Sequence, residues 1–481
     1  MSTKIISSGS VQMIRFQGAP VQHCDGLTRR EFLNAGAIGF GGLTLASLLK
    51  AEAYAGIKNS RKAVINIHLD GGPPQWETLD PKPNAPAEIR GEFGPISTSI
   101  PGVQISELMP KVASIAEQFV FIRTLVESAG RHDAFQCQSG YGFKDLASLG
   151  GRPAMGSVIN KLFGSPTDSA PAFVDIMQGR PLVRNSARPG FLGPAYQPFR
   201  PDISKMFERE LEAGMKGELR RLGADHQMSL ELNESLTVSR IDHRQSLLSG
   251  LDRIQRKVDA TGMMDAMDEF HQQATGILTS GKLAEAMDLS REDPEVIQKF
   301  TAPSSSDKLA SYTSEGPNAP QKFLLARRLI EAGVRVVSVS ISDFDTHRDH
   351  FGRINTLMPI VDFGLHALVT DLQERGMLDD VTIVAWGEFG RTPKVNSNGG
   401  RDHWPRVGPC FLAGGGMKTG QVIGKTDRLA AETIERPVTY KDVFATLYKN
   451  LGIDASQVAL IDPQGRPQYI LDEAQPLAEV G

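Results

Sequence analysis

Short apolar runs alternate along the chain with stretches in which apolar residues recur at helical spacing. The runs are rich in β-branched and aromatic residues, which favours strands. They cover 63–69, 119–123, 172–177, 334–341, 381–386 and 409–414. Strands that are apolar on both faces are typical of parallel sheets covered by helices. The pattern therefore predicts an α/β fold, a three-layer sandwich with a mostly parallel central sheet.

The pattern changes between Phe207 and Phe300, where no strand-like run occurs and long polar helices are indicated. We expect a helical insertion at about 205–300, inside one domain that spans 56–481.

The N-terminal stretch has the layout of an export signal. Arg29 and Arg30 precede Phe32 and Leu33, and a weakly apolar run from Ala35 to Leu49 ends in small residues. This order is typical of a twin-arginine signal peptide over 1–55, cleaved after Ala53 or Ala55. The run is shorter than the roughly 20 residues of a membrane helix, so no stable membrane span is expected. The sequence predicts a periplasmic or secreted protein that the twin-arginine machinery exports in folded form.

Charge and cysteine content narrow the function classes. The formal net charge is -4, and no long basic run is present, which argues against nucleic acid as a partner. Cys24 lies in the leader. Cys137 and Cys410 could pair in an oxidising compartment or fill core space, and the core interpretation is favoured because no CxxC motif is present.

Ionisable residues follow the predicted strands directly. Asp70 follows the first run, Asp345 and His347 follow the run at 334–341, and Glu388 and His403 follow the run at 381–386. Ligands of open α/β sheets bind at the carboxyl ends of the strands, so these side chains should converge. Mixed carboxylate and imidazole ligands suit zinc, manganese or iron. The sequence predicts a site for one or two divalent metal ions, zinc or manganese.

The same segments resemble a known family. The stretches "LDGGPPQWETLDPKP", "DFDTHRDHF", "GEFGRTPKVNSNGGRDHWP" and "PVTYKDVFATLYKNLGID" are similar to the family catalogued as domain of unknown function 1501, placed in the alkaline phosphatase and sulfatase superfamily. The resemblance implies an alkaline phosphatase-like fold with up to two metals, bound by Asp70, Asp345 with His347, Glu388 and His403. Phe389 stands where that superfamily usually has a metal-binding His, which puts one metal position in question.

The resemblance also implies a nucleophile near the start of the helix after the second strand, where the chain reads "RTLVESAGRHDAFQCQSGY". Ser128 is a candidate nucleophile there, and His132 is a candidate catalytic or metal-binding residue. Arg391 could contact an anionic group in catalysis or pair with Glu388 or Asp402. Further candidates are Arg401 for substrate binding, Trp76 as a wall for a sugar ring or as packing, and Asp402 as an acceptor that orients His403.

Together these features favour an exported metal-dependent hydrolase of a phosphate or sulfate ester, with a small-molecule or glycan substrate. The alternative is a non-catalytic scaffold of the same fold that binds an anionic glycan or an exported partner. A transferase or isomerase that uses the same metal site is a third possibility.

Overall fold

The computed structural model describes residues 62–147, 150–165, 168–179, 187–207, 281–302, 313 and 315–481. All of them belong to the compact unit Asn59–Gly481. The predicted signal peptide and residues 208–280 of the predicted helical insertion lie outside the described residues. In the part that is described, no helix is both long and apolar enough to cross a bilayer.

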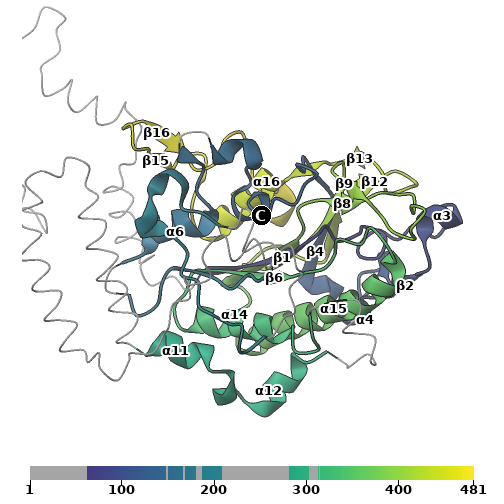
Figure 1. The fold of residues 1–481 in the computed structure, drawn as a ribbon, viewed down its shortest axis with the longest axis horizontal. Coiled ribbons are helices and arrows are strands. Elements are labelled where there is room, and N and C mark those ends of the chain that lie inside the picture. The colour runs from purple at the N-terminus through teal and green to yellow at the C-terminus, as the bar shows by residue number, and fades with distance from the viewer. Residues whose placement is uncertain are drawn as a thin grey trace, which may run out of the picture. The chain divides into compact units, whose positions relative to one another are not determined.

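One eight-stranded sheet forms the centre of the molecule (Figure 1), and its strand order is β11-β4-β10-β7-β1-β6-β5, with β14 beside β4. The bounds are β1 Ala63–Leu69, β4 Phe119–Val126, β5 Phe173–Asp175, β6 Val336–Ile341, β7 Val381–Trp386, β10 Gly408–Gly414, β11 Gln421–Ile423 and β14 Val438–Thr439. Strands β5, β6, β1 and β7 are parallel neighbours, and only β10 runs antiparallel to the strands beside it. The predicted α/β class and mostly parallel sheet are confirmed.

Helices cover both faces of this sheet. In Figure 1, α14 and α15 lie with α4 on one side, and α6 and α16 lie on the other. The bounds are α4 Pro110–Ser114, α5 Gln136–Ser139, α6 Met155–Phe163, α14 Gln321–Glu331, α15 His350–Glu374 and α16 Tyr440–Asn450. Ile65, Ile67 and Leu69 of β1 belong to the core shared with α14 and α15. Since side chains alternate along a strand, Asn66 and His68 face the opposite layer, where Asn66 Nδ2 donates to the Cys137 carbonyl of α5 at 2.6 Å.

Shorter elements decorate this framework. They are α3 Ala87–Arg90, α11 Lys282–Met287, α12 Pro294–Lys299, and the antiparallel pairs β2 Pro95–Ser97 with β3 Gln104–Ser106, β8 Gly390–Arg391 with β9 His403–Trp404, β12 Lys425–Thr426 with β13 Thr433–Glu435, and β15 Ala459–Ile461 with β16 Pro467–Tyr469. Cys137 and Cys410 are buried free thiols, in keeping with the core interpretation.

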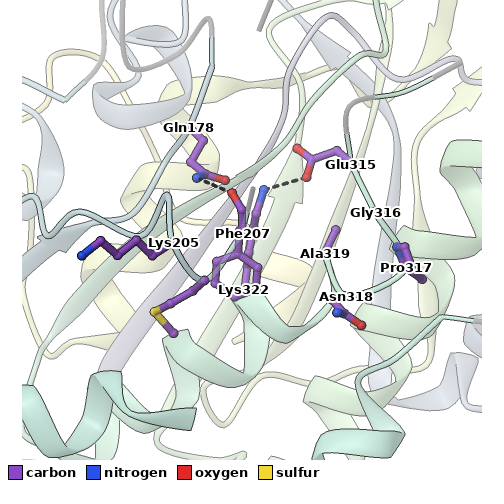
Figure 2. Close-up of a pocket in the computed structure, with 10 residues that line it drawn as sticks. Gln178, Lys205, Phe207, Glu315, Gly316, Pro317, Asn318, Ala319 and Lys322 are labelled. Carbon is purple, nitrogen blue, oxygen red and sulfur yellow. Dashed lines mark hydrogen bonds and ion pairs between the residues drawn. The ribbon is translucent and has the colours of Figure 1, made fainter. Parts of the chain in front are cut away.

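A cavity of about 310 Å³ lies beside the segment that leaves β6 (Figure 2). Its wall includes Lys322 and Glu315, which form a buried ion pair of 2.7 Å. Glu315 Oε1 also accepts from the backbone N–H of Ser342 at 3.0 Å. Lys322 and Glu315 therefore satisfy each other, and Glu315 fixes the start of the segment that carries Asp345.

Candidate metal centre

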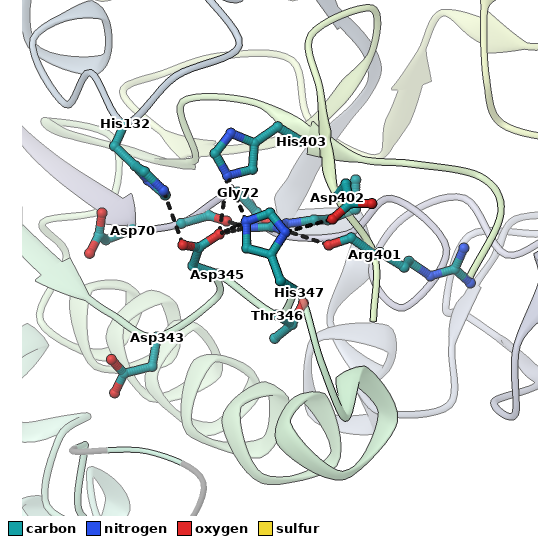
Figure 3. Close-up of polar contacts among 12 residues, drawn as sticks. Asp70, Gly72, His132, Asp343, Asp345, Thr346, His347, Arg401, Asp402 and His403 are labelled. Atoms are coloured by element: carbon teal, nitrogen blue, oxygen red, sulfur yellow. Dashed lines mark hydrogen bonds and ion pairs between the residues drawn. The ribbon is translucent and has the colours of Figure 1, made fainter. Parts of the chain in front are cut away.

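The loops after β1, β6 and β7 bring their ionisable side chains together at one edge of the sheet (Figure 3). Asp345 lies at the centre of the cluster. Its Oδ1 is 2.9 Å from His347 Nε2 and 3.1 Å from His403 Nε2, and its Oδ2 is 3.0 Å from His132 Nε2. The convergence that the sequence predicts for Asp345, His347 and His403 is present, although metal binding by them stays a prediction.

We call Asp345, His347 and His403 the outer group, and hydrogen bonds fix how its two imidazoles are oriented. His347 Nδ1 lies 2.6 Å from Asp402 Oδ1, and His403 Nδ1 lies 3.2 Å from the Gly130 carbonyl. The hydrogen bond from His347 holds the pKa of Asp402 below its usual range, so the Asp402 carboxylate is ionised and accepts the hydrogen bond. The Gly130 carbonyl can only accept as well. Both imidazoles therefore donate from Nδ1 and direct Nε2 at Asp345.

This orientation brings lone pairs together. The two Nε2 atoms are 3.1 Å apart, and each is about as far from Asp345 Oδ1. Atoms bound to one zinc ion at about 2.0–2.1 Å are separated by roughly 3 Å, so the spacing fits a shared cation. A metal-ligating His also commonly donates its second N–H to a carboxylate or carbonyl, as His347 and His403 do. Asp402 thus orients His347. The sequence predicted His403 as its partner.

His132 lies between two carboxylates. Its Nδ1 is 3.1 Å from Glu388 Oε1, and its Nε2 is 3.0 Å from Asp345 Oδ2. Burial lowers the pKa of His132, but the hydrogen bonds to Asp345 and Glu388 outweigh it and raise that pKa to about 9. Conversely, burial raises the pKa of Asp345, but the hydrogen bond from His132 and the charge of Arg391 bring it well below its usual range. His132 therefore carries a positive charge between two acidic groups when no metal is present.

His68, Asp70 and Glu388 form a second cluster, here called the inner group, and all three are buried. His68 Nε2 lies 3.6 Å from Glu388 Oε2 and 3.9 Å from Asp70 Oδ1. Neither ring nitrogen of His68 has a hydrogen-bond partner in the described part of the chain, and burial lowers its pKa. A neutral imidazole whose Nε2 faces two carboxylates at these separations leaves room for a cation between them. The inner group therefore fits a metal as well.

His68 is not among the residues predicted from the sequence. It lies inside β1, whereas the predicted site residues all follow a strand. The alternation of side chains in "HLD" was the available signal, because residues two apart share one face of a strand.

Two glycines let the loops approach one another. Gly71 (φ 104°) and Gly72 (φ 79°) have conformations that favour glycine. A Cβ on Gly71 would lie 2.4 Å from the Asp345 backbone nitrogen, and one on Gly72 would lie 2.4 Å from the Phe389 ring. The Gly71 N–H also donates to Glu388 Oε1 at 3.0 Å. The two glycines therefore let the loop after β1 pack closely against the loops that carry Asp345 and Glu388.

Arg391 is fully buried and is bound to the loop backbones. It donates to the carbonyls of Gly71, Gly72 and Arg401, and its Nη2 donates to Asp345 Oδ1 at 2.7 Å. Through these contacts Arg391 holds together the loops that follow β1, β6 and β7. The pairing expected from the sequence was with Glu388 or Asp402 instead.

Arg401 and Trp76 are also buried, on the far side of these loops. The Arg401 guanidinium lies 4.3 Å from the centre of the Trp76 ring and donates to the Ile89 carbonyl at 2.7 Å. Trp76 Nε1 donates to the Leu429 carbonyl at 3.2 Å. Figure 3 shows Arg401 extending away from the candidate metal centre, so the substrate contact expected of it has no support in this arrangement. The contacts of Trp76 are those of a packed side chain.

The hydroxyl of Ser128 donates to the Glu388 carbonyl and accepts from the Gly130 N–H at 3.0 Å. The side chain therefore braces the turn before His132. Asp343 is likewise directed away from the cluster, because its Oδ2 accepts from Thr313 at 2.8 Å. This geometry makes Asp345 the member of the "DFDTH" segment that faces the metal centre.

Phe389 packs its ring on the metal-site imidazoles. Its ring centre is 4.1 Å from that of His403 in a stacked arrangement and 5.4 Å from that of His132. Phe389 thus forms an apolar support behind the outer group.

The family model described as "Protein of unknown function (DUF1501)" matches residues 61–480. The chain belongs to this family. No curated protein matches it significantly in sequence. Several solved structures are similar at low scores. One is Ps i-CgsB in complex with k-i-k-neocarrahexaose, with a TM-score of 0.37 and 9% identity over 82% of this chain and 73% of that chain. Another is the phosphonate monoester hydrolase of Agrobacterium radiobacter, with a TM-score of 0.30 and 14% identity over 81% and 74%.

Proposed function

We propose that this member of the DUF1501 family is an exported hydrolase that uses one or two divalent metal ions to cleave a phosphate or sulfate ester. The observation that carries the proposal is the convergence of His347 Nε2, His403 Nε2 and Asp345 Oδ1 within about 3 Å of one another, next to the inner group. The similarity of the sequence motifs to the alkaline phosphatase and sulfatase superfamily supports the same reaction class.

A bound divalent cation would neutralise the ester oxygens and lower the pKa of a bound water, so that it attacks at neutral pH. The chain's own residues prepare the site for this. Asp402 and the Gly130 carbonyl fix the two outer imidazoles, and Arg391 holds Asp345 in place. His132 is partly exposed, and its Nε2 lies 3.0 Å from Asp345 Oδ2, so it is placed to pass a proton to a leaving oxygen.

A non-catalytic scaffold is the second candidate. It is favoured by the engagement of the Ser128 hydroxyl with the Glu388 backbone, which leaves this predicted nucleophile occupied. Such a protein would bind an anionic glycan or an exported partner through the same metal centre.

An assay with added metal separates the two candidates. Metal-free protein is supplied with zinc, manganese or calcium and tested on aryl phosphates and aryl sulfates. The hydrolase proposal expects metal-dependent turnover that is lost in His403→Ala. Asp379→Asn, an exposed carboxylate before β7, is the matched control and should retain turnover. Tight metal binding without turnover of any of these esters would favour the scaffold.

Export is a separate part of the proposal and rests on Arg29 and Arg30. Replacing both by Lys should hold the precursor in the cytoplasm, as measured by cell fractionation. Unchanged export of this variant would contradict the twin-arginine assignment.

A further inference from the structure

A buried carboxylate behind the metal centre contacts two of the three loops that supply its candidate ligands. Glu77 lies in the loop that follows Asp70, and its side chain is 1% exposed. Its Oε1 is 3.2 Å from Arg401 Nη2, and its Oε2 is 3.2 Å from His350 Nε2, a close polar contact rather than an aligned hydrogen bond. The Arg401 and His350 side chains are fully buried as well.

Each partner of Glu77 is joined to a ligand-bearing segment. His350 Nδ1 is 2.6 Å from Thr346 Oγ1, and Thr346 lies between Asp345 and His347. Arg401 is two residues before His403, and its backbone N–H donates to the Thr346 carbonyl at 3.0 Å. Glu77 itself belongs to the loop of Asp70. The three loops therefore meet at one carboxylate that does not touch the candidate ligands.

The buried ion pair of Glu77 and Arg401 makes the contact between these loops difficult to open. A carboxylate and a guanidinium that are buried together are costly to separate, because either one left alone is a buried charge without compensation. Arg401 is further fixed by the Thr392 and Ile89 carbonyls and by the face of Trp76. A shift of either loop would break several of these contacts together.

We propose that Glu77 is a positioning residue of the metal centre, which holds the Asp345–His347 segment and the Asp402–His403 segment at the separation that a shared cation requires. This inference rests on the proposed function for its purpose, but the coupling of the two segments through Glu77 is measurable without metal or substrate.

The test uses the full chain and compares Glu77→Gln, which keeps the shape and removes the charge, with Asp371→Asn. Asp371 is a buried carboxylate near the far end of α15, 2.9 Å from Arg327 Nε. The control therefore also breaks a buried ion pair, but away from the site. A third variant, His350→Asn, can retain the bond to Thr346 and severs the contact with Glu77.

Amide hydrogen exchange of the metal-free protein is the first readout. We expect Glu77→Gln to raise exchange at least about tenfold in both 343–350 and 396–403, His350→Asn to raise it in 343–350 alone, and Asp371→Asn to change neither. Unchanged protection in both segments of Glu77→Gln would overturn the proposal. Should Glu77→Gln fail to fold, the segment-specific effect of His350→Asn decides.

Zinc titration is the second readout. Outer-sphere partners of metal sites typically contribute about 10–100-fold in affinity, and we expect a loss of that size for Glu77→Gln with no change for Asp371→Asn. Equal zinc affinity of Glu77→Gln and the unmutated protein would overturn the purpose assigned to Glu77. If the unmutated protein binds no zinc, the proposed function fails, while the exchange experiment still decides whether Glu77 couples the segments.

Discussion

At the scale of single residues, the candidate metal centre depends on which nitrogen of each histidine carries the proton. Asp402 and the Gly130 carbonyl both accept from Nδ1, and this leaves Nε2 of His347 and His403 free to bind a cation. Neither acceptor touches the position that the cation would occupy. The metal affinity of the site should therefore depend on residues that are not ligands.

Asp402→Asn tests this dependence. An Asn amide can present an N–H to His347 Nδ1 and so favour the tautomer that directs its N–H, rather than a lone pair, at Asp345. We expect zinc affinity to fall about 10–100-fold, measured by calorimetry. Asp379→Asn removes an exposed acidic charge before β7 and should leave the affinity unchanged. An unaltered affinity in Asp402→Asn would contradict the proposed tautomer of His347.

Asp362 of α15 is a buried carboxylate that accepts from the backbone N–H groups of Lys111 and Val112. Burial raises the pKa of Asp362 to about 6, although both hydrogen bonds oppose the shift. Because this folded-state pKa lies above the unfolded value, the contribution to stability is present below about pH 4 and is lost as the pH rises through about 6. Between about pH 4 and pH 6, the free energy of unfolding of the unmutated protein should therefore fall relative to that of Asp362→Asn, by up to about 3 kcal/mol.

Urea unfolding of both proteins at several pH values measures this difference. A gap that stays constant with pH, or one that moves in the other direction, would show that Asp362 is ionised at its site throughout the range.

At the scale of elements, the centre depends on how closely three loops pack at the carboxyl ends of β1, β6 and β7. These strands are adjacent and parallel, so their ends meet. The remaining closeness comes from the backbone, since the Gly71 N–H reaches Glu388 and the Gly71 carbonyl reaches Arg391. Any side chain on Gly71 would occupy the space of the Asp345 backbone.

Gly71→Ala should therefore destabilise the protein more than its backbone angle alone requires. Gly333 is the matched control, because its φ of 108° is close to the 104° of Gly71 and a Cβ added to it would meet no atom within 4 Å. Both substitutions incur the strain of a positive φ, roughly 1–2 kcal/mol. Gly71→Ala should cost at least about 2 kcal/mol more, measured by urea unfolding, and should also weaken zinc binding. Equal costs for the two variants would mean that the loops relax freely.

Much of this element-level picture could be predicted from the sequence. The strands were visible as apolar runs, and the rule that ligands bind at carboxyl ends pointed to Asp70, Asp345, His347, Glu388 and His403, which the structure brings to one edge. His68 could not be found by that rule because it lies within its strand. The surroundings of Arg401, Trp76 and Ser128 were also beyond the sequence, because a polar side chain in a loop can turn toward the solvent or toward the backbone, and only the packing decides which.

At the scale of the whole molecule, the metal centre joins loops that are far apart in the sequence. Folding must bring the loop of Asp70 to those of Asp345 and Glu388 before the inner and outer groups exist. A cation that binds only the folded state should stabilise that state by mass action, by about 2.7 kcal/mol at a free concentration of 100 times its dissociation constant. Zinc should therefore raise the melting temperature of the unmutated protein, and the increase should be smaller for His403→Ala and absent with excess chelator.

Whether Asp345, His347 and His403 bind a metal ion is decided by counting the metal that the purified protein holds. Folded, metal-free protein is dialysed against zinc or manganese, and the bound metal is counted by elemental analysis beside His403→Ala and the control Asp371→Asn. We expect at least one equivalent of tightly bound metal in the unmutated protein and in Asp371→Asn, and less in His403→Ala. An unmutated protein that binds no metal, or binds no more than His403→Ala, would contradict this expectation.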